Sequence, residues 1–375
     1  MHVPFVDLQA QYKTIQREIE AAVQAVFHSG QYILGDNVRM FEQAAADYLG
    51  SSHAVGVGNG SDALYLALKA CDIGPGCEVL TTPFSFVASS DAILRTGAKP
   101  VFVDIDEKTY NMDPFLIEER ITPRTRAILP VHLYGQCANM EEVMRIAKKH
   151  SLTVIEDACQ AFGTVYKGRM AGTMGNIGCF SFFPTKNLGG CGDGGMLATD
   201  DRDLAEKLRM LRVHGSKTRY HHEVAGGINS RLDEIQAAIL RVKLRYIDEW
   251  NRRRNEMAAK YAALLQELPL QLPVRETHSS HIYHLFTVKT SGKPERDELI
   301  AYLHRNGVQT AVHYPVPIYL HPSYLDLGYQ AGDCPIAERV SEAICSLPLY
   351  PEMTEESLNH VARVVSAFYQ GRRMP

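Results

Sequence analysis

Long apolar runs, a secretion signal and paired cysteines are all missing from this 375-residue sequence. No apolar run reaches the roughly 20 residues that cross a bilayer, and the start, MHVPFVDLQAQYKTIQREIE, lacks the charged and apolar regions of a signal peptide. The eight cysteines contain no CxxC pair and have no accompanying ligands at metal spacing, so we expect reduced thiols and no metal site. These absences predict a cytoplasmic protein that does not bind a membrane.

Clustered positive charge is also scarce, which removes the usual basis for binding nucleic acid. The formal net charge is −4. One basic run, RRR at 252–254, stands between Glu249 and Glu256 in a helical pattern, so we interpret it as a solvated helix face. A hydrophobic content of 45% in a chain of this length favours a large core and more than one lobe.

Between about residues 50 and 200, short apolar runs alternate with helical patterns. This alternation predicts an α/β fold with a mostly parallel sheet and helices on both faces. The strand-like runs are EVLTT (78–82), PVFVDI (100–105), AILPVHL (127–133), LTVIEDA (152–158), IGCFSFF (177–183) and GMLAT (195–199). The last two follow each other without a helix between them, which indicates a less regular part of the sheet.

The second half of the chain follows a different pattern. From residue 232 to about 268 the sequence predicts one long helix that connects two lobes. A smaller α+β domain is then predicted by two strands and two helices, at 284–290, 308–314, 295–307 and 355–370. We therefore expect a large domain of residues 1–250 and a small C-terminal domain of residues 251–375.

Ligands of open α/β sheets lie beyond the carboxyl ends of the strands, so residues at these ends are candidates for a site. In VGVGNGSDAL, Gly60 leaves space, and the amides of Ser61 and Asp62 open a helix. This arrangement suits a phosphate, although ordinary helix capping explains it as well. In VIEDACQAFG, Glu156 and Asp157 end a strand, and alternation lets one face a ligand while the other stays structural.

Lys186 stands in SFFPTKNLGGCGDGG, just before a glycine-rich run. In a closed site such a lysine becomes a nucleophilic amine that can form a Schiff base; otherwise it is a surface residue or a point charge for phosphate. In PFSFVASSDAIL, Phe84 and Phe86 belong to the core or stack on a ring. An anion site, an acidic strand end, an aromatic ring and a lysine together match the needs of pyridoxal phosphate.

Several longer motifs occur in collinear order along essentially the whole chain. They are PFVDL (4–8), SGQYILG (29–35), GNGSDAL (58–64), PVFVDID (100–106), LYGQCANM (133–140), EDACQAFG (156–163), SFFPTKNLGGCGDGG (181–195), INSRLDEIQAA (228–238) and AVHYP (311–315). With these motifs the chain resembles the DegT/DnrJ/EryC1/StrS family of sugar aminotransferases. The resemblance implies the aspartate-aminotransferase fold type I, with a mostly parallel seven-stranded sheet, and pyridoxal phosphate as cofactor.

The resemblance also implies roles for residues in matching motif positions. Lys186 would bond the cofactor aldehyde and later act as acid–base catalyst, and Asp157 would pair with the ring nitrogen. The other cofactor contacts would come from Gly60, Ser61, Asp62, Phe86, Gln160, Ser181 and Asn229. In this family the residue matching Asn229 reaches the phosphate from the neighbouring subunit, which implies a homodimer with shared active sites. Family members with His in place of the lysine are dehydratases, so the retained Lys186 favours transamination.

The implied substrates are L-glutamate and a nucleotide-linked keto sugar. The forms of SGQYILG, NGSDAL, YHHEVAGGINSRLD and TAVHYP are similar to those of members that act on 3-keto sugar nucleotides, including hexuronates. The residues that would then approach the sugar are Tyr32, Arg231, His313 and Tyr314, although Arg231 could equally serve its own motif structurally. The alternatives are a 4-keto sugar nucleotide, an inosose with glutamine as donor, other chemistry on the retained lysine, or a non-catalytic regulator with the same fold.

Overall fold

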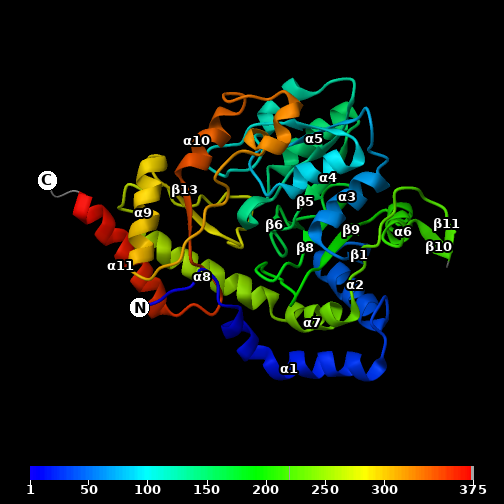
Figure 1. The fold of residues 1–375 in the computed structure, drawn as a ribbon, viewed down its shortest axis with the longest axis horizontal. Coiled ribbons are helices and arrows are strands. Elements are labelled where there is room, and N and C mark those ends of the chain that lie inside the picture. Colours follow the sequence, from blue (N-terminus) through cyan, green and yellow to red (C-terminus); the bar gives the residue numbers. More distant parts are fainter. Residues whose placement is uncertain (219, 373–375) are drawn as a thin grey trace.

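The computed structural model describes residues 1–218 and 220–372 (Figure 1). The strands in these residues are β1 (His53–Val57), β2 (Glu78–Thr81), β3 (Lys99–Phe102), β4 (Thr125–Leu129), β5 (Thr153–Asp157), β6 (Val165–Tyr166), β7 (Arg169–Met170), β8 (Ile177–Ser181), β9 (Gly195–Thr199), β10 (Ser216–Thr218), β11 (His221–His222), β12 (Phe286–Lys289) and β13 (Ile344–Leu347). The α-helices are α1 (Leu8–Ser29), α2 (Asp36–Leu49), α3 (Gly60–Ala70), α4 (Ala88–Thr96), α5 (Met140–His150), α6 (Arg202–Leu211), α7 (Glu234–Leu244), α8 (Ile247–Leu265), α9 (Lys293–Arg305), α10 (Pro335–Ala343) and α11 (Glu355–Arg372). Short 3-10 helices occupy Pro114–Leu116, Glu118–Arg120, Leu133–Gly135, Ile318–Leu320 and Pro322–Leu327.

A seven-stranded sheet lies at the centre of the larger part, with strand order β1-β9-β8-β5-β4-β2-β3. The pairings β2–β3, β2–β4, β4–β5 and β5–β8 are parallel. Strand β9 runs antiparallel to both of its neighbours, β1 and β8. The predicted α/β fold with a mostly parallel seven-stranded sheet is confirmed, and the pair of strands without a helix between them is the antiparallel step.

Alternate residues of the strands enter two different apolar clusters, as expected for the two faces of a sheet. Val154 and Met196 belong to one cluster, whereas the adjacent Ile155 and Leu197 belong to the other. Helix α3 contributes most of its residues to the second cluster, and α1, α2 and α7 contribute to the first. Both faces are therefore covered, which explains why the central strands are apolar throughout.

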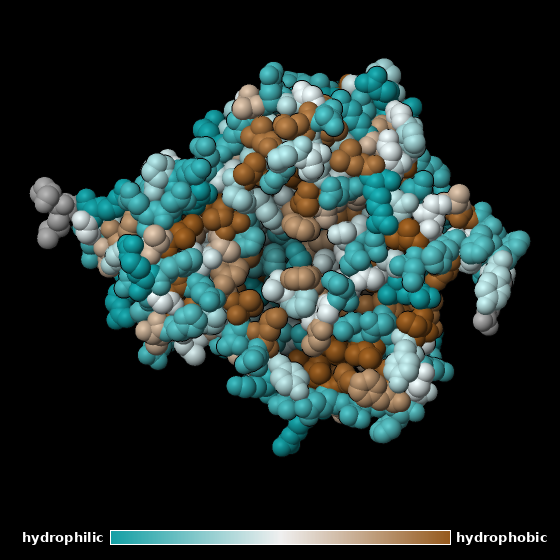
Figure 2. Space-filling view, in the orientation of Figure 1, coloured by the Kyte–Doolittle hydropathy of each residue, from teal (hydrophilic) through white to brown (hydrophobic). Residues whose placement is uncertain are grey.

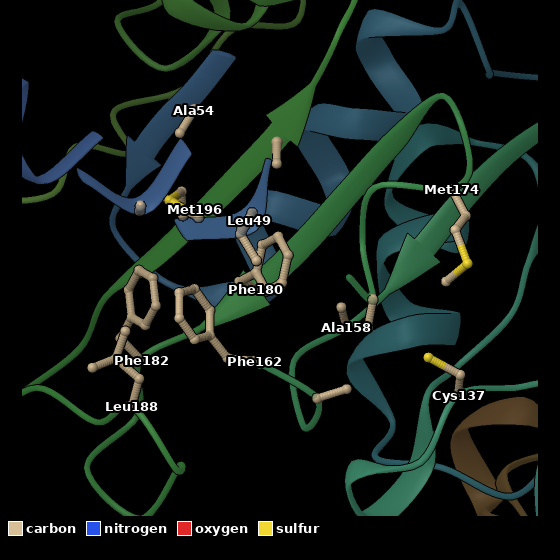
Figure 3. Close-up of a cluster of buried hydrophobic side chains, with 14 of the residues drawn as sticks. Leu49, Ala54, Cys137, Ala158, Phe162, Met174, Phe180, Phe182, Leu188 and Met196 are labelled. Carbon is tan, nitrogen blue, oxygen red and sulfur yellow. The ribbon is translucent and has the colours of Figure 1, made fainter. Parts of the chain in front are cut away.

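Three phenylalanines in the first cluster support the end of β8 (Figure 3). The ring centroid of Phe162 lies 5.5 Å from that of Phe180 and 6.0 Å from that of Phe182, in edge-to-face geometry. Such aromatic pairs add about 0.5–1.5 kcal/mol to the gain from burial. Because Phe182 and the buried Leu188 flank Lys186 in the sequence, this packing anchors the loop that carries the lysine.

The smaller part of the molecule contains the antiparallel pair β12–β13 and the helices α9 and α11, to one side of the long helix α8 (Figure 1). These elements share a third apolar cluster, which also includes Val3 from the N-terminal segment. Tyr319 and Tyr324, although late in the chain, pack in the second cluster with helix α3. The division into residues 1–250 and 251–375 stays a proposal. Val3 packs with the C-terminal part, and Tyr319 and Tyr324 pack with the N-terminal part.

Two of the expected elements are wrong. The long helix expected at 232–268 is two helices, because the amides of Arg245 and Tyr246 donate to carbonyls three residues earlier and the Tyr246 ring stacks on Trp250, with centroids 5.9 Å apart. The strand expected at 308–314 is not a strand. Val308 pairs with the N-terminal segment and Ala311 with Ser346, so no continuous ladder forms there.

The basic run in α8 is not uniformly solvated. Arg252 is exposed and pairs with Glu249 and Glu256, as expected. Arg254 is only 4% exposed, and its Nη1 donates to the carbonyl of Leu349 at 2.8 Å and to that of Tyr283 at 3.1 Å. The interpretation as a solvated face is therefore wrong for Arg254, which joins α8 to the segments that follow it.

Candidate active site

Lys186 lies in a tight loop that follows β8. Its amide donates to the carbonyl of Phe183 at 2.8 Å. A Cβ on Gly189 would stand 2.3 Å from the carbonyl oxygen of Pro184, so a side chain does not fit at this position. At least this glycine after the lysine therefore permits close packing of the backbone.

Helix α7 holds the same loop from the other side. Lys243 Nζ donates to the carbonyl of Gly189 at 2.7 Å, and the amide of Cys191 donates to Gln236 Oε1 at 2.8 Å. The loop is thus fixed to a helix by two side chains, which is the kind of support that a precisely placed reactive group requires.

Burial governs the charge of Lys186. Loss of solvent lowers the pKa of its ammonium below the usual range, and the interactions with Cys159 and Asp157 offset only part of this effect. A lysine with a lowered pKa has a larger share of neutral amine, which is the nucleophilic form. Among the alternatives left open by the sequence, the half-buried side chain and the lowered pKa of Lys186 favour the nucleophilic amine.

The two acids at the end of β5 have different surroundings. Asp157 is 5% exposed; its Oδ2 accepts a hydrogen bond from Ser89 Oγ at 2.7 Å and its Oδ1 accepts one from the amide of Cys159 at 3.2 Å. Glu156 is fully buried and bonds to a different part of the chain. Asp157 is the carboxylate whose charge acts on Lys186.

The start of α3 faces Ser181 at close range. A Cβ on Gly60 would stand 2.7 Å from the Cβ of Ser181, so a larger residue would displace one of the two backbones. Asn59 caps the helix, and its Oδ1 accepts the amide of Asp62 at 2.8 Å, the amide that the sequence analysis expects to face a phosphate. Within the described part of the chain the amides of Gly60 and Ser61 have no such partner, so they are the open donors.

Aromatic and amide side chains line the adjoining surface. Phe84 is a fully buried core residue, whereas Phe86 is 56% exposed, with its ring centroid 6.4 Å from that of Tyr314. Gln160 accepts from the amide of Tyr134 at 2.8 Å and donates to the hydroxyl of Tyr314 at 3.1 Å. Phe86 thus remains available to a flat ligand, and Gln160 is held in one orientation.

His313 belongs to the same group through its neighbour Tyr314. Its Nδ1 lies 3.0 Å from Ser346 Oγ, and its ring stacks on Phe5 with centroids 5.8 Å apart. Loss of solvent and the charge of Lys186 lower the pKa of His313 to about 4. At neutral pH this residue is therefore an uncharged imidazole that can donate or accept a hydrogen bond.

Three expected site residues are not brought into contact with this group. Tyr32 is 47% exposed and Asn229 is also exposed; Asn229 forms an isolated bridge with Val213, and the carbonyl of Tyr32 accepts the amide of Glu234 at 3.0 Å. Arg231 is partly buried, and within the described residues its Nε has no hydrogen-bond partner. A buried donor without a partner costs about 1–3 kcal/mol, so this atom is one that a ligand or another chain would stabilise.

Ser89 and Tyr134 contact the site residues, yet sequence reasoning missed both. Ser89 binds Asp157, and Tyr134 binds Gln160 through its amide. Each lies in a stretch already singled out, Ser89 three residues after Phe86 and Tyr134 at the start of LYGQCANM. The helical spacing after Phe86 was the available signal for Ser89.

The donor set fits pyridoxal phosphate. The carboxylate of Asp157 suits a ring nitrogen, the open amides at α3 and the hydroxyl of Ser181 suit a phosphate, and the Lys186 amine, whose pKa is lowered by loss of solvent, suits an aldehyde. A mostly parallel sheet with the acid at the end of β5 and the lysine loop after β8 defines a pyridoxal-phosphate-dependent aminotransferase of fold type I.

The family follows from comparison with known proteins. The sequence profile of the DegT/DnrJ/EryC1/StrS aminotransferase family matches residues 13–366, and the chain belongs to this family. It is 48% identical over 370 residues to a pleiotropic regulatory protein of Geobacillus stearothermophilus (99% of each chain), and 47% identical over 352 residues to the dTDP-3-amino-3,4,6-trideoxy-alpha-D-glucose transaminase of Streptomyces venezuelae (94% of this chain, 92% of the relative). The crystal structure of S. venezuelae DesV in complex with a ketimine intermediate superposes with a TM-score of 0.95 at 45% identity, over 100% of this chain and 99% of that one. The predicted family, enzyme class and cofactor are confirmed.

Proposed function

We propose that this aminotransferase moves an amino group from L-glutamate to C3 of a nucleotide-linked 3-keto sugar, giving an amino sugar. The observation that carries the transfer chemistry is the desolvated Lys186 amine beside Asp157. The sugar class is supported by the Streptomyces relative, whose name specifies a 3-amino sugar on dTDP. A 4-keto sugar nucleotide, or an inosose with glutamine as donor, is the alternative within the same class of enzyme.

Each residue of the site has a task toward the cofactor. When bound, pyridoxal phosphate supplies an aldehyde for amines and a ring that takes up electrons from the neighbouring carbon. Asp157 would keep the proton on the ring nitrogen, because a carboxylate in a desolvated site favours the cationic partner. The residues that would hold the phosphate and the ring are Gly60, Ser61, Ser181, Phe86 and Gln160.

Lys186 would carry the protons of both half-reactions. Its Nζ takes the proton from the α-carbon of the amino donor, and later delivers a proton to C3 of the sugar, the carbon that receives the amino group. Only the neutral amine can accept the first proton, and burial favours that form. A positioned acid–base group of this kind contributes about 10²–10⁴-fold to the rate.

The sugar would be recognised beyond Lys186 by Tyr32, Arg231, His313 and Tyr314. The buried Nε of Arg231, which has no partner among the described residues, and the neutral imidazole of His313 support this role, because both groups can bind a polar ligand. A carboxylate at C6 of a hexuronate would form a bidentate pair with Arg231.

We also propose a homodimer in which Asn229 reaches the phosphate in the partner's site. Its exposed side chain supports this proposal, as does an apolar groove of about 500 Å³ between α1, α2 and α7. Figure 2 shows apolar residues gathered at the lower edge of the molecule, where α1 and α7 lie. The groove is lined by Ala22, Ala25, Asn37, Met40, Ala44, Ala238, Arg241, Val242, Leu244 and Arg245. Covering it with a second chain would remove this surface from water.

The proposed compartment is the cytoplasm. All eight cysteines are free thiols, which supports a reducing environment. None of the helices in the described residues has the length and apolar content needed to cross a membrane.

A non-catalytic regulator is the candidate from another class, and the name of the Geobacillus relative is the observation that favours it. The presence of Lys186, Asp157, Gln160 and Ser181 in one site favours catalysis instead, because signal binding alone needs no desolvated amine. The two functions differ in whether L-glutamate changes the cofactor.

The visible absorbance of the cofactor-loaded protein tests the proposal. We expect its band to disappear when L-glutamate is added and to return with a 3-keto sugar nucleotide, but not with a 4-keto sugar nucleotide or an inosose. Lys186→Ala should bind the cofactor without turning over. A band that is inert to every amino donor would favour the regulator, and a return only with a 4-keto substrate would move the reaction to C4.

A further inference from the structure

Glu156 is a buried charge that the proposed chemistry does not use. It is 0% exposed, and its two carboxylate oxygens accept four N–H groups. Oε2 lies 2.7 Å from His132 Nε2 and accepts the amide of Gly172 at 2.8 Å. Oε1 accepts the amides of Met174 at 2.6 Å and Gly175 at 2.5 Å. A carboxylate with donors on all its lone-pair sites is locked in place.

His132 forms hydrogen bonds with two successive residues of β5. The amide of Ala138 donates to His132 Nδ1 at 3.2 Å, which places the ring proton on Nε2, facing Glu156. The backbone amide of His132 donates to the carbonyl of Asp157 at 3.0 Å, and the amide of Asp157 donates to the carbonyl of Pro130 at 2.9 Å. One histidine thus holds Glu156 by its side chain and Asp157 by its backbone.

The turn that supplies the other donors has no room to shift. A Cβ on Gly172 would stand 2.3 Å from Cζ of Phe180, and a Cβ on Gly178 would stand 2.0 Å from the carbonyl oxygen of Gly172. The turn therefore lies directly against β8, the strand that leads to Ser181 and the Lys186 loop. Through this turn the carboxylate of Glu156 fixes the end of β5 relative to the strand that supplies the lysine.

Asp157 depends on this framework for its direction. Its side chain is held by Ser89 Oγ and by the amide of Cys159, which lies only two residues further along the same segment. A shift of the backbone at residue 157 would move Asp157 and the Cys159 amide together. The backbone position at the end of β5 thus decides where the carboxylate points.

We propose that Glu156 and His132 form a clamp that positions Asp157 against the ring nitrogen of the cofactor. The inference rests on the role proposed for Asp157. Glu156 and His132 are positioning residues, since their bonds run to the backbone frame of the site and not to the cofactor. Glu156 and Asp157 point to opposite faces of β5. Glu156 therefore supports the backbone, while Asp157 faces the cofactor.

The test compares Glu156→Gln and His132→Phe with a matched control, Glu78→Gln. A glutamine at 156 presents an NH₂ group to an N–H donor, and phenylalanine at 132 removes the ring donor. Glu78 is also a buried, hydrogen-bonded carboxylate, but it begins β2 at the opposite end of the parallel strands. His132→Gln keeps a donor and is the conservative variant, which also serves if the harsher changes do not fold.

The measurements are the affinity of the apoprotein for pyridoxal phosphate, the thermal midpoint, and kcat and KM of the L-glutamate half-reaction. We expect Glu156→Gln and His132→Phe to lose about tenfold or more in cofactor affinity and in kcat, as for a catalytic group displaced by part of an ångström, with KM for glutamate nearly unchanged. His132→Gln should recover part of both losses. Glu78→Gln should lower the thermal midpoint but keep cofactor affinity and kcat.

Two results would overturn the clamp. Folded Glu156→Gln with the cofactor affinity and kcat of the wild type would show that Asp157 needs no support from it. Equal losses in Glu78→Gln would show that any loss of stability has the same effect. Asp157→Asn is measured in parallel, because its unchanged affinity and rate would refute the role of Asp157 itself, and with it the purpose of the clamp.

Discussion

The carboxylate of Asp157 is almost fully buried and accepts two hydrogen bonds, from Ser89 Oγ and from the amide of Cys159. A hydrogen bond to a charged group is worth roughly 1.5–3 kcal/mol in such surroundings. The backbone amide cannot be removed by substitution, whereas the hydroxyl of Ser89 can. Substitution of Ser89 is therefore the most direct way to remove a hydrogen bond from the Asp157 carboxylate.

We expect Ser89→Ala to slow the L-glutamate half-reaction by about tenfold, because the carboxylate proposed to hold the ring nitrogen loses its stronger donor. Ser90→Ala is the matched control, since Ser90 Oγ is buried beside it and has no partner among the described residues. Stopped-flow absorbance gives both rates. Equal rates for the two variants would show that the Ser89 hydroxyl does not matter to Asp157.

At the residue scale, Lys186 and Asp157 could be singled out as candidates from the sequence, but each had a structural alternative. Their roles were assigned from the combination of an anion site, an acid, an aromatic ring and a lysine, and from the family resemblance. The engagement of the Asp62 amide was not predictable, because it depends on the side-chain orientation of Asn59. Arg254 was misread because its burial comes from segments far away in the chain.

Gly168 and Gly172 both have a left-handed backbone, but they differ in how closely other elements pack against them. Gly168 has φ +81° and a Cβ there would meet nothing within 4 Å, whereas Gly172 has φ +82° and a Cβ there would stand 2.3 Å from Phe180. Both positions strain an L-residue by roughly 1–2 kcal/mol, but only Gly172 is also crowded. The pair therefore separates backbone strain from packing.

We expect Gly168→Ala to cost about 1 kcal/mol of unfolding free energy and Gly172→Ala about 3 kcal/mol or more, because the second adds overpacking against Phe180. Urea unfolding of the two apoproteins measures the difference. Similar losses in both would mean that the turn before β8 can move away, which would also weaken the argument for the clamp on Glu156.

At the element scale, the alternation of apolar runs was enough for the sheet, since strands covered on both faces must be apolar. Strand order leaves no local pattern, and the missing helix before β9 indicated only a less regular part of the sheet, without its antiparallel direction. The break between α7 and α8 was missed because Arg245 and Tyr246 are ordinary helix residues. It involves a contact of Tyr246 with Glu18, which is more than 200 residues away in the sequence, besides the local stacking on Trp250.

Buried histidines make the whole molecule sensitive to acid. Loss of solvent and, to a lesser degree, Arg275 lower the pKa of His281 from 6.5 to about 3, and loss of solvent and Lys186 lower that of His313 to about 4. A base with a lowered pKa binds its proton more readily in the unfolded chain. Below pH 6.5 the unfolded state therefore binds protons that the folded state does not bind. The free energy of unfolding falls as the pH falls toward the folded-state pKa values of these histidines.

We expect the unfolding free energy of the apoprotein to decrease between pH 6.5 and 4, by up to about 1.4 kcal/mol per pH unit for each such histidine. His281→Asn should make this slope shallower, because asparagine can still accept the Tyr283 amide, which donates to His281 Nδ1 at 3.0 Å, but does not titrate. Urea unfolding at a series of pH values gives the slope. An unchanged slope in His281→Asn would show that His281 is protonated in the folded state.

The proposed sharing of active sites would be a property of the proposed dimer as a whole. Lys186→Ala and Asn229→Ala should each be nearly inactive, yet mixing and refolding them should restore about one quarter of the wild-type activity, because half of the dimers are hybrids with one intact site. Size-exclusion chromatography with light scattering confirms the dimer in each sample. No recovery in verified hybrids would place Asn229 outside the partner's site.

The central claim is that this enzyme moves an amino group from L-glutamate to C3 of a sugar nucleotide, with Lys186 as the acid–base group. The most direct measurement supplies ¹⁵N-labelled L-glutamate and a 3-keto sugar nucleotide to the cofactor-loaded protein and locates the label by NMR and mass spectrometry. The account predicts ¹⁵N on C3 of the product with the wild type and none with Lys186→Ala. Label at another carbon, no label with the wild type, or equal label with Lys186→Ala would contradict it.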